Sequence, residues 1–413
     1  MTQDDGRGDQ DGHRDGPLDG YRAPGLSWTR VMRAREPAEP HRAATPLELF
    51  FDLCFVVAVS LAAARLHHAL AEQHVGAGLL GYLMVFFAIW WAWMNFTWFA
   101  SAYDTDDALY RVTTLIQITG ALVLAAGVPA AFDRGDFTIV TVGYVIMRLA
   151  MVAQWLRAGA TNRWQRPCTL RYAGGIAVVQ LGWVLRLLLP PGLLVVSFVV
   201  LAVAEIAVPA WAERYGPTSW HPGHIAERYS LFTLIVLGEV VLAAASAIQE
   251  ALAEGEHLGA LLGVAAAGIV IVFSMWWLYF DEPAERLLTG LRTALGWGYG
   301  HYLVFGSAAA VGAGLEVAVD FDSGRTQLAP VLAGLATAVP VAVFLLTVWL
   351  LHVRPRPGGR VGALNVAYPL VAVLVLATPW SPAPVHLTAV LVAALVVLNL
   401  VVKQRADRAV AIS

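Results

Sequence analysis

The sequence is poor in charged side chains, in lysine and in cysteine. Charged residues make up 14% of the 413 residues, whereas an ordinary soluble domain has about 25%, so the composition favours a polytopic membrane protein. Lys403 is the only lysine among 27 basic residues, and the net charge of −3 excludes a basic nucleic-acid-binding protein. The two cysteines, Cys54 and Cys168, provide neither a disulfide framework nor a metal-binding spacing.

Short motifs for nucleotide or zinc chemistry are also missing. No P-loop, dinucleotide fingerprint, G-x-S-x-G turn or H-E-x-x-H motif occurs in the sequence. The sequence therefore predicts no cofactor and no energy source beyond an ion gradient. The first 45 residues contain no apolar segment, so we expect residues 1–45 to be a disordered cytosolic tail and not a cleaved signal.

Long apolar stretches dominate the rest of the chain. A helix of about 20 apolar residues crosses the hydrocarbon core of a bilayer. A succession of apolar stretches of this length predicts an all-α, polytopic helical membrane protein. We expect twelve transmembrane helices, at residues 47–70, 76–100, 108–131, 136–158, 170–189, 191–212, 224–248, 258–280, 295–317, 327–351, 361–379 and 382–402.

Lysine and arginine are distributed unevenly between the two sides of these spans. If the amino terminus is cytosolic, 19 of these residues lie at cytosolic loops and ends and 4 lie outside. Cytosolic loops of membrane proteins carry the excess of positive charge. The distribution therefore predicts a multi-pass protein with an even number of spans, both termini in the cytosol and the lipid bilayer as its surroundings.

A weak internal repeat relates the two halves of the chain. "ELFFDLCFVVAVSLAAA" of the first span resembles "RYSLFTLIVLGEVVLAAA" of the seventh, and "WWAWMNF" resembles "WWLYFDE", which aligns Asn95 with Asp281. We therefore expect two parallel six-helix repeats, 46–212 and 213–403, followed by a cytosolic tail, 404–413. Asn95 and Asp281 become candidate binding residues because the repeat places polar groups at both positions.

Two acidic residues lie one helical turn apart at the start of the first span. Glu48 and Asp52 share a helix face, with Asp52 the deeper of the two. A carboxylate inside the hydrocarbon core costs about 2.5–3.5 kcal/mol, so Asp52 needs a partner. One interpretation is a cation or proton site open to the cytosol. The other is an acidic helix cap at Glu48 and a structural ion pair from Asp52 to Arg228 or Arg148.

The seventh span begins with a group of polar residues. His224, Glu227 and Arg228 are three and four residues apart, which predicts one interfacial cluster at the cytosolic end. Glu239 is expected about 18 Å deeper in the membrane than Glu227, near the midplane. A carboxylate at this depth normally faces protein or water and has a function.

Arg148, midway along the fourth span, is the expected partner of Glu239. If the two pair, they form a structural ion pair. If Glu239 is unpaired, its burial makes it a protonation switch. Glu205, in the sixth span, is a weaker candidate because it lies closer to a helix end.

An inner loop carries three carboxylates in four positions, at Asp104, Asp106 and Asp107. They are weak candidates for holding a divalent cation. Acidic caps at the start of the third span, with an Asp107–Arg111 ion pair, are the simpler alternative. Six tryptophans near the ends of the second and eighth spans are expected to form part of an aromatic belt and a packing seam: Trp90, Trp91, Trp93, Trp98, Trp276 and Trp277.

Four of these motifs, in order, resemble the bacterial low temperature requirement protein A family: "PLELFFDLCFVVAVSLA", "WWAWMNFTWFASAYDTDD", "HIAERYSLFTLIVLGEVVLA" and "SMWWLYFDE". Together they span residues 46–281. The resemblance implies a multi-pass inner-membrane protein, linked by its name to growth in the cold. The acidic positions that recur in this family correspond here to Glu48, Asp52, Asp104, Asp106, Asp107, Glu227, Glu239 and Asp281.

The leading hypothesis is a secondary transporter or ion- or proton-coupled permease for a small solute or ion. In it Glu239 and Asp52 are coupling carboxylates, and Glu227 and Arg228 form a cytosolic gate. An intramembrane lipid-modifying enzyme and a membrane sensor or scaffold are the alternatives. The permease hypothesis depends on a hydrophilic interior around the buried acids.

Overall fold

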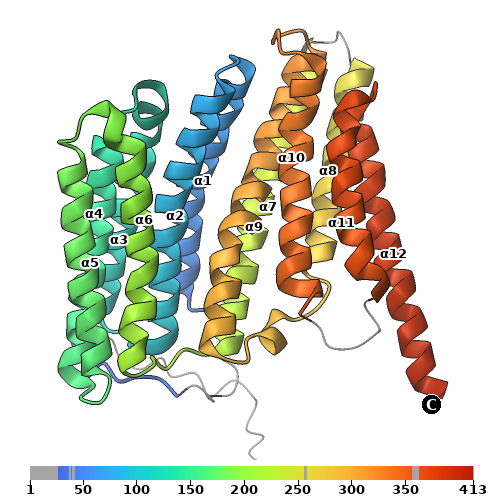
Figure 1. Ribbon diagram of the computed structural model, residues 1–413. Helices are drawn as coiled ribbons and strands as arrows, with labels where there is room; N and C mark the ends of the chain where they lie inside the picture. Colours follow the sequence, from blue (N-terminus) through green and yellow to red (C-terminus); the bar gives the residue numbers. More distant parts are fainter. Residues whose placement is uncertain (1–26, 37–38, 40–41, 255–257, 356–361, 413) are drawn as a thin grey trace, which may run out of the picture.

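The computed structural model describes residues 27–36, 39, 42–254, 258–355 and 362–412 (Figure 1). These residues form helices and connections without a strand, and twelve of the helices are long and apolar enough to cross a membrane. The prediction of an all-α protein with twelve spans is therefore confirmed. The long helices are α1 Pro46–Ala71, α2 Val75–Tyr103, α3 Ala108–Arg134, α4 Thr138–Thr161, α5 Arg166–Arg186, α6 Leu194–Ala212, α7 Pro222–Glu254, α8 Leu258–Tyr279, α9 Leu291–Asp322, α10 Pro330–Val348, α11 Gly362–Ala377 and α12 Pro384–Ile412.

Local sequence signals fix where the helices of the first half begin. Thr45 caps α1 in a capping box with Glu48, and proline follows at the first helical position. Asp107 caps α3 by accepting a hydrogen bond from the backbone N–H of Tyr110. These caps place Glu48 and Asp107, two of the candidate acids, at the ends of helices on the same side of the bundle.

The helices are arranged in two groups, α1–α6 and α7–α12, which lie side by side (Figure 1). Glycines allow very close helix packing in each group. A Cβ atom on Gly143 of α4 would lie 2.3 Å from the backbone nitrogen of Leu124 in α3, and one on Gly314 of α9 would lie 2.2 Å from the carbonyl oxygen of Ala336 in α10. Corresponding helix pairs thus pack tightly in both halves, and the two-fold sequence repeat stays a prediction.

An aromatic seam joins the two groups of helices. Trp93 of α2 stacks on Phe232 of α7, with ring centroids 4.4 Å apart, and meets Phe305 of α9 edge-on. Trp90 lies 5.3 Å from Tyr302 of α9. The α2 tryptophans therefore form the expected packing seam. Trp276 and Trp277 of α8 are more than 40% exposed, as expected for an aromatic belt.

Both ends of the described chain lie on one side of the bundle, at the bottom of Figure 1. We call this side the terminal side. The residues that precede α1 pack across its helix ends: the backbone N–H of Arg35 donates to the Ala102 carbonyl, the Arg42 guanidinium donates to the Ala100 carbonyl, and Met32 is fully buried. The prediction of a disordered tail therefore does not hold for residues 27–36, while residues 1–26 lie outside the described part.

Candidate functional site

The first buried ionic group joins α1 to α7 at the terminal side. The Arg228 guanidinium holds both oxygens of Asp52, at 2.5 Å from Nη2 to Oδ1 and 3.1 Å from Nε to Oδ2. The indole N–H of Trp93 donates to the same carboxylate at 2.7 Å. Both charged side chains are fully buried. Of the two partners predicted for Asp52, the structure therefore selects Arg228.

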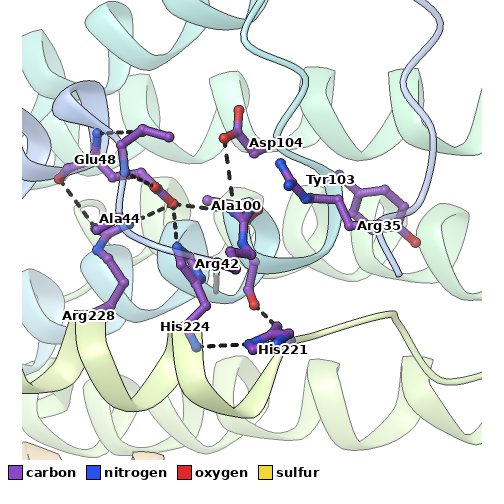
Figure 2. A network of polar contacts seen from close by, with 12 residues as sticks. Arg35, Arg42, Ala44, Glu48, Ala100, Tyr103, Asp104, His221, His224 and Arg228 are labelled. Carbon is purple, nitrogen blue, oxygen red and sulfur yellow. Dashed lines mark hydrogen bonds and ion pairs between the residues drawn. The ribbon is translucent and has the colours of Figure 1, made fainter. Parts of the chain in front are cut away.

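Glu48 is the centre of this group, as Figure 2 shows. Its Oε1 lies 3.0 Å from Nη1 of Arg228 and 3.1 Å from Nε2 of His224, and its Oε2 accepts the backbone N–H of Thr45 at 2.7 Å. Arg42 approaches from the segment before α1, at 3.8 Å. We call these five residues, Arg42, Glu48, Asp52, His224 and Arg228, the Arg228 cluster.

The Arg228 cluster is fully desolvated, and its charges nearly balance. Two guanidinium groups face the two carboxylates of Glu48 and Asp52, and every one of these side chains is at most 3% exposed. Because an unpaired charge in such a place costs several kcal/mol, the cluster is stable only while its partners stay together. It joins α1 to α7 at the terminal side.

A second buried ionic group lies deeper, inside the first half. Arg148 of α4 donates from Nη2 to Oε2 of Glu205 in α6 at 2.6 Å, and both side chains are at most 1% exposed. The Glu205 carboxylate also accepts hydrogen bonds from Trp91, Tyr144 and Trp183, at 2.9, 2.9 and 3.3 Å. The predicted Arg148–Glu239 pair is wrong, because Glu205 is the partner of Arg148.

Arg148 keeps free donors in this group. Its Nε and Nη1 atoms have no hydrogen-bond partner in the described residues, and neither has the amide of Gln180 in α5. Trp183 lies beside Tyr144, and in antiparallel helices Gln180 and Arg148 are each about one turn further toward the terminal side. Buried donors without partners cost about 1–3 kcal/mol each, so this depth is suited to ordered water.

Glu239 differs from the other candidate acids. It lies on α7 about 22 Å beyond His224, within the candidate membrane span Pro222–Ser246. Among the described residues no hydrogen bond or ion pair involves its carboxylate, and the residue is only partly buried. Of the two interpretations drawn from the sequence, the structure favours the unpaired carboxylate.

Three other candidates, Glu227, Asn95 and Asp281, are spread over the protein. Glu227 does not join Arg228 or His224, because its Oε2 accepts the backbone N–H of Ala44 at 3.2 Å. The buried Asn95 donates to the Trp91 carbonyl one turn earlier. Asp281 forms an ion pair of 2.7 Å with Lys403 of α12. The predicted interfacial cluster of His224, Glu227 and Arg228 is therefore only partly correct.

The three loop acids each bind a different arginine. Asp104 lies 3.9 Å from Arg42, Asp106 pairs with Arg111 at 2.7 Å, and Asp107 pairs with Arg157. The predicted Asp107–Arg111 pair is thus replaced by Asp106–Arg111. In the described part of the chain, no group of three or more His, Cys, Asp or Glu side chains is placed to hold a metal ion. The helix-cap interpretation of Asp107 is correct.

Two of these loop carboxyls have opposite electrostatic surroundings. Burial and the negative charge of Glu48 raise the pKa of Asp104 to about 6, although Arg42 opposes the rise. Burial also acts on Asp107, but the Arg157 guanidinium and the backbone N–H groups of Tyr110 and Arg30 hold its pKa below the ordinary value. Of these two acids, Asp104 is therefore the one that gains a proton first, as the pH falls through about 6.

The larger cavities are apolar. One, of about 370 Å³, lies between α1, α2, α9 and α10, and another, of about 390 Å³, lies between α2, α6 and α9. Two smaller cavities have volumes of about 20 Å³: one, beside Asn95 and Glu213, lies between the first half and α9, and the other, beside Tyr144 and Arg186, lies within the first half. Each is large enough for one water molecule. These four cavities form no wide hydrophilic vestibule around the buried acids.

Glu205 is more central than its place in the sequence suggests. Its distance from the helix end suggested a peripheral place, but α6 packs against α5, and the four donors around Glu205 come from α2, α4 and α5. The available signal was the set of buried-type polar residues on neighbouring helices, namely Arg148, Trp183 and Trp91. Each of these carries an N–H donor and needs an acceptor in an apolar interior.

Comparison with known proteins agrees with this architecture. The chain is similar to an uncharacterized protein of Rhizobium meliloti (strain 1021), with 28% identity over 271 residues, which are 61% of this chain and 61% of that protein. The sequence pattern of the family described as bacterial low temperature requirement A protein matches residues 43–401, which include all twelve spans nearly to their ends. The chain therefore belongs to the bacterial low temperature requirement A (LtrA) family.

Proposed function

We propose that this membrane protein is a secondary transporter that couples the movement of a small solute or ion to proton transfer. Glu239 is the proton-carrying residue in this proposal. The observation that carries it is that Glu239 has no described partner within a membrane span. A carboxyl in this position can bind and release a proton without breaking a contact, whereas Glu48, Asp52 and Glu205 cannot.

The Arg228 cluster is the closed gate of this transporter. It joins α1 of the first half to α7 of the second half through the Asp52–Arg228 and Glu48–His224 contacts. Opening the terminal side requires these helices to separate, and the cluster must then exchange its internal partners for water. A conformation closed on this side also accounts for the absence of a wide hydrophilic vestibule among the described cavities.

Proteoliposomes loaded with a pH-sensitive dye test the proposal. A panel of amino acids, sugars, carboxylates and organic cations is added outside, and wild-type protein is expected to move protons with at least one of them. Glu239→Gln should abolish this proton movement but keep solute exchange. Glu72→Gln is the matched control, since the Glu72 side chain is 70% exposed. The proposal would be contradicted if the wild type moved protons with none of the solutes in the panel. It would also be contradicted if Glu239→Gln moved as many protons per solute as the wild type.

A membrane sensor or scaffold is the second candidate. It is favoured by the pairing of Glu48, Asp52 and Glu205 with buried arginines, which suits a rigid structural role. Copurification of a stable partner from membranes, together with no flux in the proteoliposomes, supports this candidate against the transporter. The lipid-modifying enzyme is disfavoured, because the polar side chains in the 370 Å³ cavity bond to backbone carbonyls.

The transporter proposal includes the orientation in the plasma membrane. Both described ends of the chain lie on one side (Figure 1). Most of the lysine and arginine residues of the sequence fall in the loops and ends assigned to that side. Because cytosolic loops carry such charges, we place the terminal side in the cytosol. Fusions of a reporter that fluoresces only in the cytosol should be active at both ends, and a dark fusion at either end would overturn this orientation.

A further inference from the structure

The cavity of about 370 Å³ lies between the two halves of the protein, and we call it the inter-half cleft. Its walls come from α1 and α2 of the first half and from α9 and α10 of the second. Many of its wall residues are large aliphatic side chains that are 40–50% exposed, such as Leu79, Leu83 and Leu332. The cleft therefore opens sideways, toward the hydrocarbon of the membrane.

The side-chain hydroxyl groups in the cleft wall already form hydrogen bonds within the protein. The Tyr82 hydroxyl donates to the Gly306 carbonyl at 2.7 Å, the Tyr302 hydroxyl donates to the Leu83 carbonyl at 2.8 Å, and the Ser307 hydroxyl donates to the Leu303 carbonyl. A polar solute would lose its hydrogen bonds to water here and gain none, at a cost of several kcal/mol. The chemistry of the wall selects a hydrocarbon occupant.

The depth of the cleft identifies the kind of hydrocarbon. On α2 its wall runs from Val75, at the loop end, to Phe86, which is about 16 Å along the helix axis. This length is about half of a hydrocarbon core that is roughly 30 Å thick. One acyl chain of a single leaflet has the matching length, and the relevant leaflet is the one opposite the terminal side.

Polar residues surround the mouth of the cleft, where a lipid headgroup would lie. His67, next to the wall residue Leu66, lies 2.6 Å from Asp320, and Arg325 lies 3.1 Å from the same aspartate. Arg325 is 39% exposed, three residues before the wall residue Leu328. The polarity thus changes from charged at the mouth to apolar inside, which is the polarity of a phospholipid.

We propose that the inter-half cleft is a specific binding site for one acyl chain of a phospholipid from the leaflet opposite the terminal side. The bound chain contacts both halves at once, beside the Tyr82–Gly306 and Tyr302–Leu83 hydrogen bonds that tie α2 to α9. It therefore stabilises the contact between the halves. This site does not depend on the transport proposal, because a sensor or scaffold with the same cleft binds the same lipid.

Lipid-depleted protein in detergent provides the test. Added dioleoylphosphatidylethanolamine should raise the thermal midpoint of the wild type in a saturable manner, as expected for a ligand of the folded state. Val339→Trp fills the cleft from α10 and should lose this rise. Val373→Trp on α11 is the matched control, because Val373 is 63% exposed and lies outside the cleft wall. Its rise should equal that of the wild type.

A second variant and a second measurement secure the result. Leu332→Trp, nearer the mouth, should also lose the rise. A phosphatidylethanolamine with a photoreactive diazirine on one acyl chain should label α2, α9 and α10 in the wild type and in Val373→Trp, but not in Val339→Trp. An equal rise in all the tryptophan variants, or labels spread evenly over the lipid-facing helices, would overturn the proposal.

Discussion

Trp91 and Trp93 are two residues apart on α2, and they donate to buried carboxylates on opposite sides of that helix. The Trp91 indole N–H bonds to Glu205 in α6, and the Trp93 indole N–H bonds to Asp52 in α1. A helix turns about 200° over two residues, so the two rings face in nearly opposite directions. Helix α2 is therefore held in its middle by both ionic groups, which it also keeps apart.

Double-mutant cycles can test this separation. In wild-type background we expect Trp91→Phe and Trp93→Phe each to lower the free energy of unfolding by about 1.5–3 kcal/mol, because each removes a hydrogen bond to a charged group. In an Asp52→Asn background, Trp93→Phe should cost clearly less, while Trp91→Phe should keep its full cost. Thermal unfolding in detergent measures all of these differences.

The control in this cycle is the comparison of the two tryptophans, since both changes remove an indole ring of the same size. An equal reduction for Trp91→Phe and Trp93→Phe in the Asp52→Asn background would show that the two ionic groups act as one.

Breaking the Asp52–Arg228 pair should be costly. Arg228→Gln leaves the Asp52 and Glu48 carboxylates without their main partner in a fully buried place, so we expect a loss of about 3–5 kcal/mol. Arg111→Gln is the matched control, because its pair with Asp106 is more than 40% exposed on both sides and should cost less than about 1 kcal/mol. Equal midpoints for the two variants in a thermal unfolding assay would contradict the assignment of a desolvated cluster.

Asp104 should make stability depend on pH. Its pKa is about 6 in the folded protein and 3.8 as the ordinary value, so the folded state holds the proton more tightly than the unfolded state. The contribution of Asp104 is then full below about pH 4 and is lost as the pH rises through about 6. Relative to Asp104→Asn, the wild type should lose about 3 kcal/mol across this range.

Unfolding midpoints of both proteins from acidic to neutral pH measure this change. Asp107 and Glu39, whose pKa values are lowered, act in the opposite direction, because their stabilisation is lost as the pH falls. They are present in both proteins and cancel in the difference. A difference that does not vary with pH would show that Asp104 keeps its ordinary pKa.

The close contact of α3 with α4 predicts a strong effect of one methyl group. Gly143→Ala places a Cβ atom 2.3 Å from the Leu124 backbone nitrogen, so the two helices must move apart, and we expect a loss of about 1–3 kcal/mol. Gly174→Ala in α5 is the control, because nothing lies within 4 Å of its Cβ position. That change should be neutral or stabilise the helix by up to about 1 kcal/mol. Thermal unfolding separates the two outcomes.

The spans could be predicted from the sequence because each is a long apolar run with polar ends. The expected span 258–280 and the helix Leu258–Tyr279 differ by one residue. The Asp52–Arg228 pair could also be named, since both residues lie near the same ends of their spans. The hydrophobic pattern shows how deep in the membrane a residue lies on its own helix. This is sufficient to name an ion-pair partner when only one oppositely charged residue lies at the same depth.

The partner of Arg148 could not be predicted in this way. Glu205 and Glu239 both lie inside spans, and the choice between them depends on which helices are neighbours. Helix α4 packs on α5 and α5 packs on α6, which brings Glu205 toward Arg148 and leaves Glu239 in the other half. Which helices are neighbours depends on packing among twelve similar apolar helices. The hydrophobic pattern of a single helix carries no information about this.

The segment before α1 has a consequence for biosynthesis. Its contacts include the Arg35–Ala102 hydrogen bond to the end of α2 and the Thr161 hydroxyl of α4, which donates to the Met32 carbonyl. Translation makes this segment before the residues that receive it, which follow in α2 and then, 129 residues after Met32, in α4. A segment that is made before its partners thus settles after them, and its docking marks the moment at which α2 and α4 have come together.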